Sequence, residues 1–213
     1  MDTRFLPHNT HLEKLEAFFK QDPHLKQLNK QALVHRSQLL DQIPRSASGI
    51  YTLSGGRQTG KTTLLKQWMA ELLKSRVPAN SIAYMTGELI NDHHSLVRLV
   101  TGLLTEMPAQ DLKFIILDEF TYIRDWDKGV KYLADAGMLE STVLMITGSD
   151  MVIIKEARIR FPGRRGISEK LAGFVADQFQ QPMLFEIGQS PVVENDGRSD
   201  RKRNFGNEGR ASA

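Results

Sequence analysis

The residues with the clearest chemistry lie at positions 55–62, which read GGRQTGKT and fit the phosphate-binding pattern G-x-x-x-x-G-K-S/T. Glycines let the backbone curl, so that successive N–H groups point at phosphate oxygens. Lys61 is expected to reach the β- and γ-phosphates of a nucleotide, and Thr62 to offer its hydroxyl to Mg²⁺. The pattern predicts a nucleotide site formed by Gly55, Gly56, Arg57, Gln58, Thr59, Gly60, Lys61, Thr62 and Thr63.

The segments on either side of this loop have the character that the chemistry requires. Residues 49–53 are rich in β-forming side chains and end at the loop. Residues 62–74 are predicted to be a helix, because apolar side chains recur there at helical spacing and Pro78 follows. Strand, loop and helix therefore come in the order that points the positive end of the helix at a bound phosphate.

A second group of chemically useful residues follows the apolar run 114–117, which predicts a buried strand ending in Asp118 and Glu119. Ligands of parallel α/β sheets bind at the carboxyl ends of the strands. Asp118 is expected to hold Mg²⁺, which prefers oxygen ligands, together with Thr62. Glu119 is expected to polarise the water that attacks the γ-phosphate.

Two further positions are candidates for contact with the γ-phosphate. Thr147 and Ser149 directly follow the predicted strand 142–146 and are alternative sensor residues, although Gly, Ser and Asp also form simple turns. Arg164 and Arg165 are alternative arginine fingers, since an arginine beside a transferring phosphoryl group stabilises its charge.

Alternating strand and helix patterns predict an α/β fold with a parallel sheet covered by helices on both faces. Besides the strands already named, one is expected at 81–85, and further helices near 96–104 and 128–136. The predicted division of the chain is an N-terminal helical extension (1–45), the core (46–166), an irregular end of the core (167–188) and a disordered tail (189–213).

The composition excludes several classes of protein. The chain has 213 residues, 40% of them hydrophobic and 25% charged, as is usual for a globular domain. It has no cysteine, which excludes disulfides, thiol catalysis and thiolate metal sites. No apolar run reaches the length of a membrane span, so we expect a cytoplasmic protein with no membrane partner. A net charge of +3 does not by itself require a nucleic-acid partner. The basic cluster at 155–170 is the only sequence feature that supports one.

Four segments together resemble the AAA-type P-loop ATPases of prokaryotes: 55–63, 117–126, 146–149 and 162–164. More narrowly, they are similar to AAA-domain proteins whose longer members carry a C-terminal domain of unknown function. The resemblance implies a three-layer P-loop NTPase core with an additional strand and the parallel sheet order 5-1-4-3-2. It implies ATP rather than GTP, with Mg²⁺ as cofactor and a homo-oligomer or protein partner.

The same resemblance gives Lys61, Thr62, Asp118 and Glu119 the roles argued above and favours Arg164 as the finger. Residues 167–213 match neither the segment that follows in the longer relatives nor their second domain. We therefore expect a truncated or frameshifted product, with the fifth strand missing or formed by residues 182–187.

The sequence leaves four functions in competition. The first is an ATPase in which Mg-dependent hydrolysis drives a conformational task. The second is a nucleotide-binding switch with little turnover. A P-loop kinase and a DNA-processing ATPase are the others; paired Asp118 and Glu119 argue against the kinase.

Overall fold

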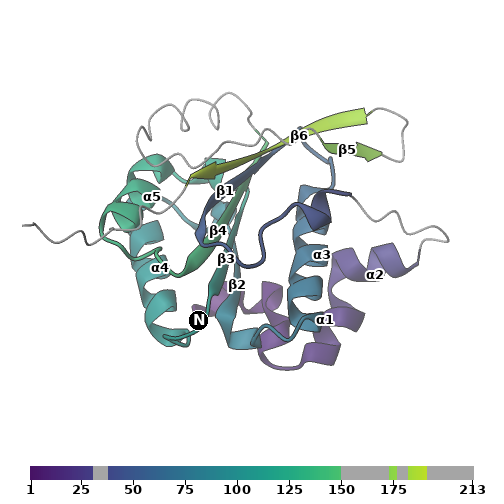
Figure 1. Ribbon diagram of the computed structural model, residues 1–213, viewed down its shortest axis with the longest axis horizontal. Helices are drawn as coiled ribbons and strands as arrows, with labels where there is room; N and C mark the ends of the chain where they lie inside the picture. Colours follow the sequence, from purple (N-terminus) through teal and green to yellow (C-terminus); the bar gives the residue numbers. More distant parts are fainter. Residues whose placement is uncertain (31–37, 150–172, 177–181, 191–213) are drawn as a thin grey trace, which may run out of the picture.

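The computed structural model describes residues 1–30, 38–149, 173–176 and 182–190, and these form a sheet between two layers of helices (Figure 1). The strand order is β2-β3-β4-β1-β6-β5. The four strands expected from the sequence are present, each within two residues of its expected ends. The strands are β1 (Gly49–Ser54), β2 (Ile82–Thr86), β3 (Lys113–Asp118), β4 (Thr142–Gly148), β5 (Gly173–Ala176) and β6 (Pro182–Ser190).

The first four strands pair in parallel, which confirms the predicted α/β fold and the order 1-4-3-2. On β3, Phe114 and Ile116 join the core under one layer of helices, and Ile115 and Leu117 join the core under the other. Side chains alternate between the two faces of a strand, so a strand covered on both faces must be apolar throughout. This explains the uninterrupted apolar run before Asp118.

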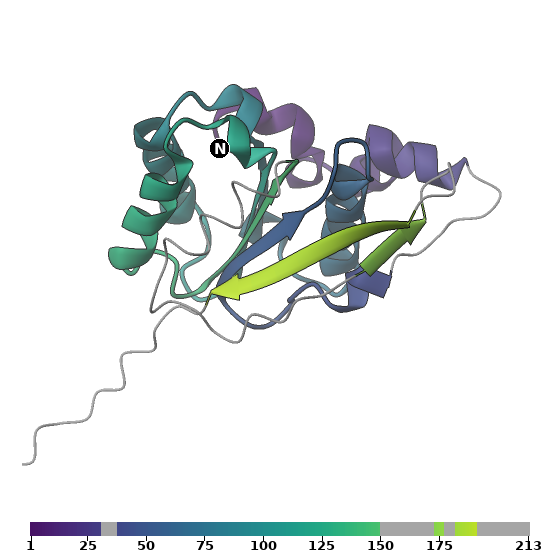
Figure 2. The ribbon, with the colours of Figure 1, turned by 90° about the horizontal axis from the view of Figure 1, so that it is seen from above.

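The strand beside β1 differs from the expected parallel order. β6 runs antiparallel to β1, and β5 pairs antiparallel with the outer side of β6, as Figure 2 shows. The candidate fifth strand at 182–187 lies within β6, while β5 and the end of β6 fall in the segments expected to be irregular (167–188) and a tail (189–213). The edge of β1 away from β4 carries backbone N–H and C=O groups that need partners, and the β-forming residues at 182–187 provide them.

The helices divide between the faces of the sheet. Helix α3 covers one face together with α1 and α2, and α4 and α5 cover the other (Figure 1). Trp68 on α3 is fully buried on the first face, and Leu96 on α4 on the second. The helices are α1 (Leu15–Gln21), α2 (Pro23–Asn29), α3 (Lys61–Lys74), α4 (His93–Glu106) and α5 (Trp126–Asp135). Short 3-10 helices are η1 (Thr3–His8), η2 (Thr10–Leu12), η3 (Gln38–Asp41), η4 (Ala79–Ser81), η5 (Gly87–Leu89) and η6 (Phe120–Tyr122).

The N-terminal segment, residues 1–30, closes the free edge of β2. The Asn9 side chain accepts from the Tyr84 N–H at 2.8 Å and donates to the Tyr84 carbonyl oxygen at 2.7 Å. His11 Nε2 lies 3.1 Å from the carbonyl oxygen of Ile82. These side chains satisfy backbone groups that an edge strand otherwise leaves open.

Several predictions fall outside the described residues. They are the arginine finger at Arg164 or Arg165, the basic cluster at 155–170, and the tail beyond Ser190. In the part of the chain that the structure describes, no helix has the length and apolar character needed to cross a membrane.

Candidate nucleotide site

The phosphate loop joins β1 to α3 and includes two residues with left-handed backbone. Gly60 has φ 83° and Gln58 has φ 60°. The Thr59 hydroxyl donates to the Gly56 carbonyl oxygen at 3.1 Å and tightens the turn. Among the described residues no side chain caps the amino end of α3. Its first N–H groups are therefore available to an anion, and the helix dipole favours negative charge there.

The ammonium group of Lys61 bends back over this loop. Its Nζ donates to the carbonyl oxygens of Gly55 at 3.0 Å and Gly56 at 2.9 Å, and the side chain is 3% exposed. Glu119 Oε1 lies 3.7 Å from the same nitrogen. The lysine charge is thus held against the phosphate loop, the place that the sequence pattern assigns to nucleotide phosphates.

The Asp118 carboxylate is fixed through both oxygens. Oδ2 accepts from the Thr62 hydroxyl at 2.7 Å and also from the Tyr84 hydroxyl. Oδ1 accepts from the Thr147 hydroxyl and from the N–H of Glu119. Three strands and the first turn of α3 therefore meet at one buried carboxylate.

The alternation of the strands explains this meeting. Ile116 and Asp118 are two residues apart on β3 and share the face toward α3, and the same holds for Met145 and Thr147 on β4. Tyr84 on β2 pairs with Ile116 and lies on that face too. Since α3 covers this face, its Thr62 reaches Asp118.

Glu119 begins the loop after β3 with φ 50°, an uncommon backbone conformation for a residue with a side chain. The Ser149 hydroxyl is 2.9 Å from both of its carboxylate oxygens. Gly87 packs against this turn so closely that a Cβ on it would lie 2.5 Å from the Glu119 carbonyl oxygen. Only glycine fits at 87 while Glu119 keeps this conformation.

The oxygen atoms at this centre suit Mg²⁺. Thr62 Oγ1 and Asp118 Oδ2 are hard oxygen donors at the carboxyl edge of the sheet, beside the loop that would hold the phosphates. Mg²⁺ is bound in such sites by one or two protein oxygens, with phosphate oxygens and waters completing the shell. The residues present therefore fit the metal that the phosphate-loop pattern implies.

A family model for the AAA domain matches residues 47–179, which is more than half of the chain. The chain belongs to the AAA domain family. The match spans the phosphate loop, the Asp118 and Glu119 pair, and both alternative sensor residues. This confirms the expected AAA type and supports a nucleotide-binding domain.

Several chains of known structure match this domain. This AAA domain is similar to the crystal structure of Cdc6p from Pyrobaculum aerophilum, with 17% sequence identity and a TM-score of 0.41. The alignment covers 76% of this chain and 45% of Cdc6p, so the chain spans less than half of that protein. No curated protein matches this chain.

The structure brings together most, but not all, of the residues that the sequence singled out. Lys61, Thr62, Asp118, Glu119, Thr147 and Ser149 form one connected cluster in this AAA domain. Arg57 and Gln58 are exposed on the loop, and Thr63 Oγ1 lies 3.4 Å from Nδ1 of His24. The roles of all these residues remain predictions.

Sequence reasoning missed three residues near this cluster: Tyr84, Lys66 and Asp22. Tyr84 contacts Asp118 directly, and Lys66 lies between Tyr84 and Asp22. One sequence feature indicates that Lys66 is buried. It lies four residues after Thr62 and three before Met69, on the face of α3 that the helical spacing turns toward the core. No sequence pattern identifies its partner.

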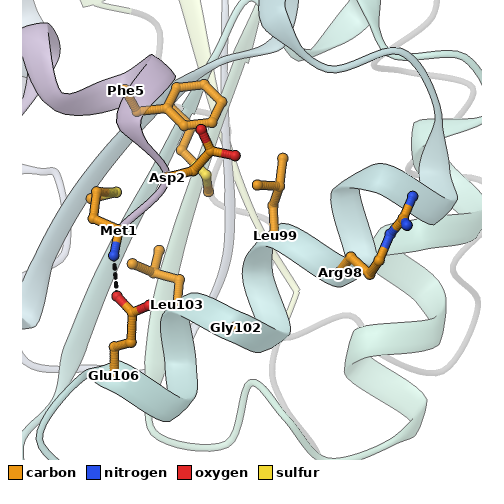
Figure 3. Close-up of a pocket in the computed structure, with 9 residues that line it drawn as sticks. Met1, Asp2, Phe5, Arg98, Leu99, Gly102, Leu103 and Glu106 are labelled. Carbon is orange, nitrogen blue, oxygen red and sulfur yellow. Dashed lines mark hydrogen bonds and ion pairs between the residues drawn. The ribbon is translucent and has the colours of Figure 1, made fainter.

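A separate cavity of about 290 Å³ lies between η1 and α4 (Figure 3). Phe5, Leu99 and Leu103 line it, and the amino group of Met1 pairs with Glu106 at its rim. None of its lining residues belongs to the phosphate loop or to the Asp118 cluster. It is therefore distinct from the nucleotide site of this AAA domain.

Proposed function

We propose that this AAA domain binds ATP with Mg²⁺ and hydrolyses it. The observation that carries the proposal is the 2.7 Å hydrogen bond from Thr62 to Asp118. It joins the phosphate loop to the acidic end of β3, two motifs far apart in the sequence. The AAA family supports ATP as the nucleotide.

In the proposed complex the loop N–H groups and the amino end of α3 bind the phosphates. Lys61 exchanges its contacts with the Gly55 and Gly56 carbonyl oxygens for contacts with the β- and γ-phosphates. Thr62 and Asp118 would hold Mg²⁺, which supplies positive charge to the same phosphates when bound.

Hydrolysis in this proposal needs a base for the attacking water. Glu119 accepts a proton from water as the water oxygen bonds to the γ-phosphorus and the bond to the bridging oxygen of ADP breaks. Ser149 is the better sensor candidate, because its hydroxyl contacts Glu119 and lies 3.5 Å from Lys61 Nζ. Thr147 instead holds Asp118.

A nucleotide-binding switch with little turnover is the second candidate. One observation favours it: Ser149 and Lys61 engage the Glu119 carboxylate, so this group must be released before it can accept a proton from water. An arginine finger at Arg164 or Arg165, in the same chain or from a neighbouring copy, stays a prediction. The homo-oligomer or protein partner on which hydrolysis would act also stays a prediction.

The test compares Glu119→Gln with Glu88→Gln, a control glutamate that is exposed on η5. Phosphate release from ATP should fall about 100-fold or more in Glu119→Gln, because the general base is lost. ATP binding should persist in both variants, and Glu88→Gln should turn over like the wild type. Unchanged phosphate release from ATP in Glu119→Gln would contradict the proposed mechanism. ATP binding without phosphate release by the wild type would favour the switch.

A further inference from the structure

The Tyr84 hydroxyl is a contact to Asp118 that no nucleotide-binding motif predicts. Tyr84 is 2% exposed on β2 and donates to Asp118 Oδ2, the oxygen that also accepts from Thr62. A carboxylate oxygen can only accept, so the phenol hydroxyl is the donor of this bond.

The ring of Tyr84 is held by a buried charge. Lys66 Nζ lies 3.9 Å from the ring centroid, a distance at which cation and ring attract each other. The same nitrogen donates to the His8 carbonyl oxygen at 2.8 Å and lies 3.4 Å from Asp22 Oδ2. Asp22 in turn caps α2 by accepting from the N–H groups of His24 and Leu25. The position of Lys66 thus depends on two points of the N-terminal segment.

The backbone of Tyr84 is held by the same segment. The Asn9 side chain bonds both its N–H and its carbonyl oxygen, and the His8 ring lies 5.5 Å from the Tyr84 ring. Asn9 is 1% exposed and also donates to the Phe5 carbonyl oxygen at 2.7 Å. Backbone and ring of Tyr84 are therefore fixed by residues that precede the predicted core.

We propose that Tyr84 is a positioning residue for Asp118, and that the N-terminal segment holds Tyr84 in place and so belongs to the Mg-ATP site. The inference rests on the proposed function and deepens it. A group that donates to a metal-binding carboxylate sets the orientation and basicity of that carboxylate. Without the phenol hydroxyl, Asp118 Oδ2 keeps Thr62 as a donor but loses the donor from the β2 side.

The test measures ATP binding by fluorescence across a Mg²⁺ titration, and again in EDTA, for Tyr84→Phe. Tyr51→Phe is the matched control, because Tyr51 is a buried tyrosine whose hydroxyl donates to the Ala47 carbonyl oxygen at 2.9 Å. In Tyr84→Phe the half-saturating Mg²⁺ concentration should rise about 10-fold or more. Binding without metal should not change, and Tyr51→Phe should match the wild type.

Three results separate this inference from the proposed function. If the wild type binds Mg-ATP and Tyr84→Phe has the same Mg²⁺ dependence, the inference is wrong and the proposed function stands. Equal loss of binding with and without Mg²⁺ also overturns it, since that pattern indicates general damage. A wild type that does not bind Mg-ATP overturns both.

The role of the N-terminal segment needs a second measurement. Asn9→Ala should shift the Mg²⁺ dependence in the same direction, and less so in the Tyr84→Phe background, because residues that act through one another are not additive. If Asn9→Ala does not fold, Asn9→Ser replaces it in this comparison of single and double variants. Additive shifts would overturn the part assigned to the segment.

Discussion

Helix α3 carries two buried lysines, Lys61 and Lys66. The regions around them differ in whether a bound ligand can replace the contacts of the lysine. Lys61, at the amino end, contacts two loop carbonyl oxygens whose place phosphate oxygens can take. Lys66, five residues on, contacts Asp22 and the His8 carbonyl oxygen inside the N-terminal segment. One lysine is placed to bind a ligand, and the other is committed to the fold.

The energetics of the two sites differ accordingly. Burial lowers the pKa of Lys66, and Asp22 works against that shift by favouring the charged form. Removing one partner of a buried ion pair leaves an uncompensated charge, which destabilises more than the pair itself stabilises. Removing the partner of Lys66 therefore destabilises the folded protein. Removing Lys61 instead weakens the binding of a ligand.

The largest stability effect is expected from Asp22→Ala. It leaves the Lys66 charge buried without its carboxylate and should lower the free energy of unfolding by about 3–5 kcal/mol, measured by urea denaturation. Adding Lys66→Met should recover most of that loss, because the buried charge is then gone.

The matched control for this variant is Glu16→Ala. Glu16 pairs with Lys20 at 3.4 Å, the same separation as the buried pair, but both side chains are exposed. Exposed pairs contribute little, so Glu16→Ala should denature close to the wild type. Equal losses for the two variants would mean that burial does not distinguish these ion pairs.

A smaller loss of folding stability is expected at acidic pH. Burial lowers the pKa of His8 and of His11 below the ordinary 6.5, and nearby Lys66 lowers both further. The unfolded chain therefore takes up protons that the folded chain resists, so stability is complete above about pH 6.5 and declines below it. Urea denaturation between pH 7 and pH 5 should show a shallower decline in His11→Gln than in the wild type. A decline in His11→Gln as steep as that of the wild type would contradict the assignment of the decline to this buried histidine.

The sequence predicted the surroundings of Lys61 because their signals are local. Glycine spacing identifies the loop, and the apolar run before Asp118 identifies a strand covered on both faces. The parallel order 1-4-3-2 follows from the AAA resemblance, and the structure agrees with it. The antiparallel direction of β6 was not predictable, since it depends on which edge remains open after the parallel strands have paired.

The surroundings of Lys66 show the opposite case. Its place on a buried stripe of α3 is readable from the sequence, but Asp22 and Tyr84 lie on separate elements. The Tyr84 contact with Asp118 requires the register that sets Tyr84 beside Ile116 on β3. The bonds from Asn9 to the Tyr84 backbone join the N-terminal segment to β2, and no sequence pattern indicates that this segment packs there. Long-range pairing of this kind leaves no local pattern.

Calorimetric titration of ATP with Mg²⁺ into the wild type and Lys61→Met tests most directly whether the amino end of α3 is a nucleotide site. The control is Lys74→Met, at an exposed lysine near the other end of the same helix. Wild type and Lys74→Met should bind ATP alike, and Lys61→Met should lose about 2–5 kcal/mol of binding free energy. ATP binding of equal strength in all three proteins would contradict the assignment of this site.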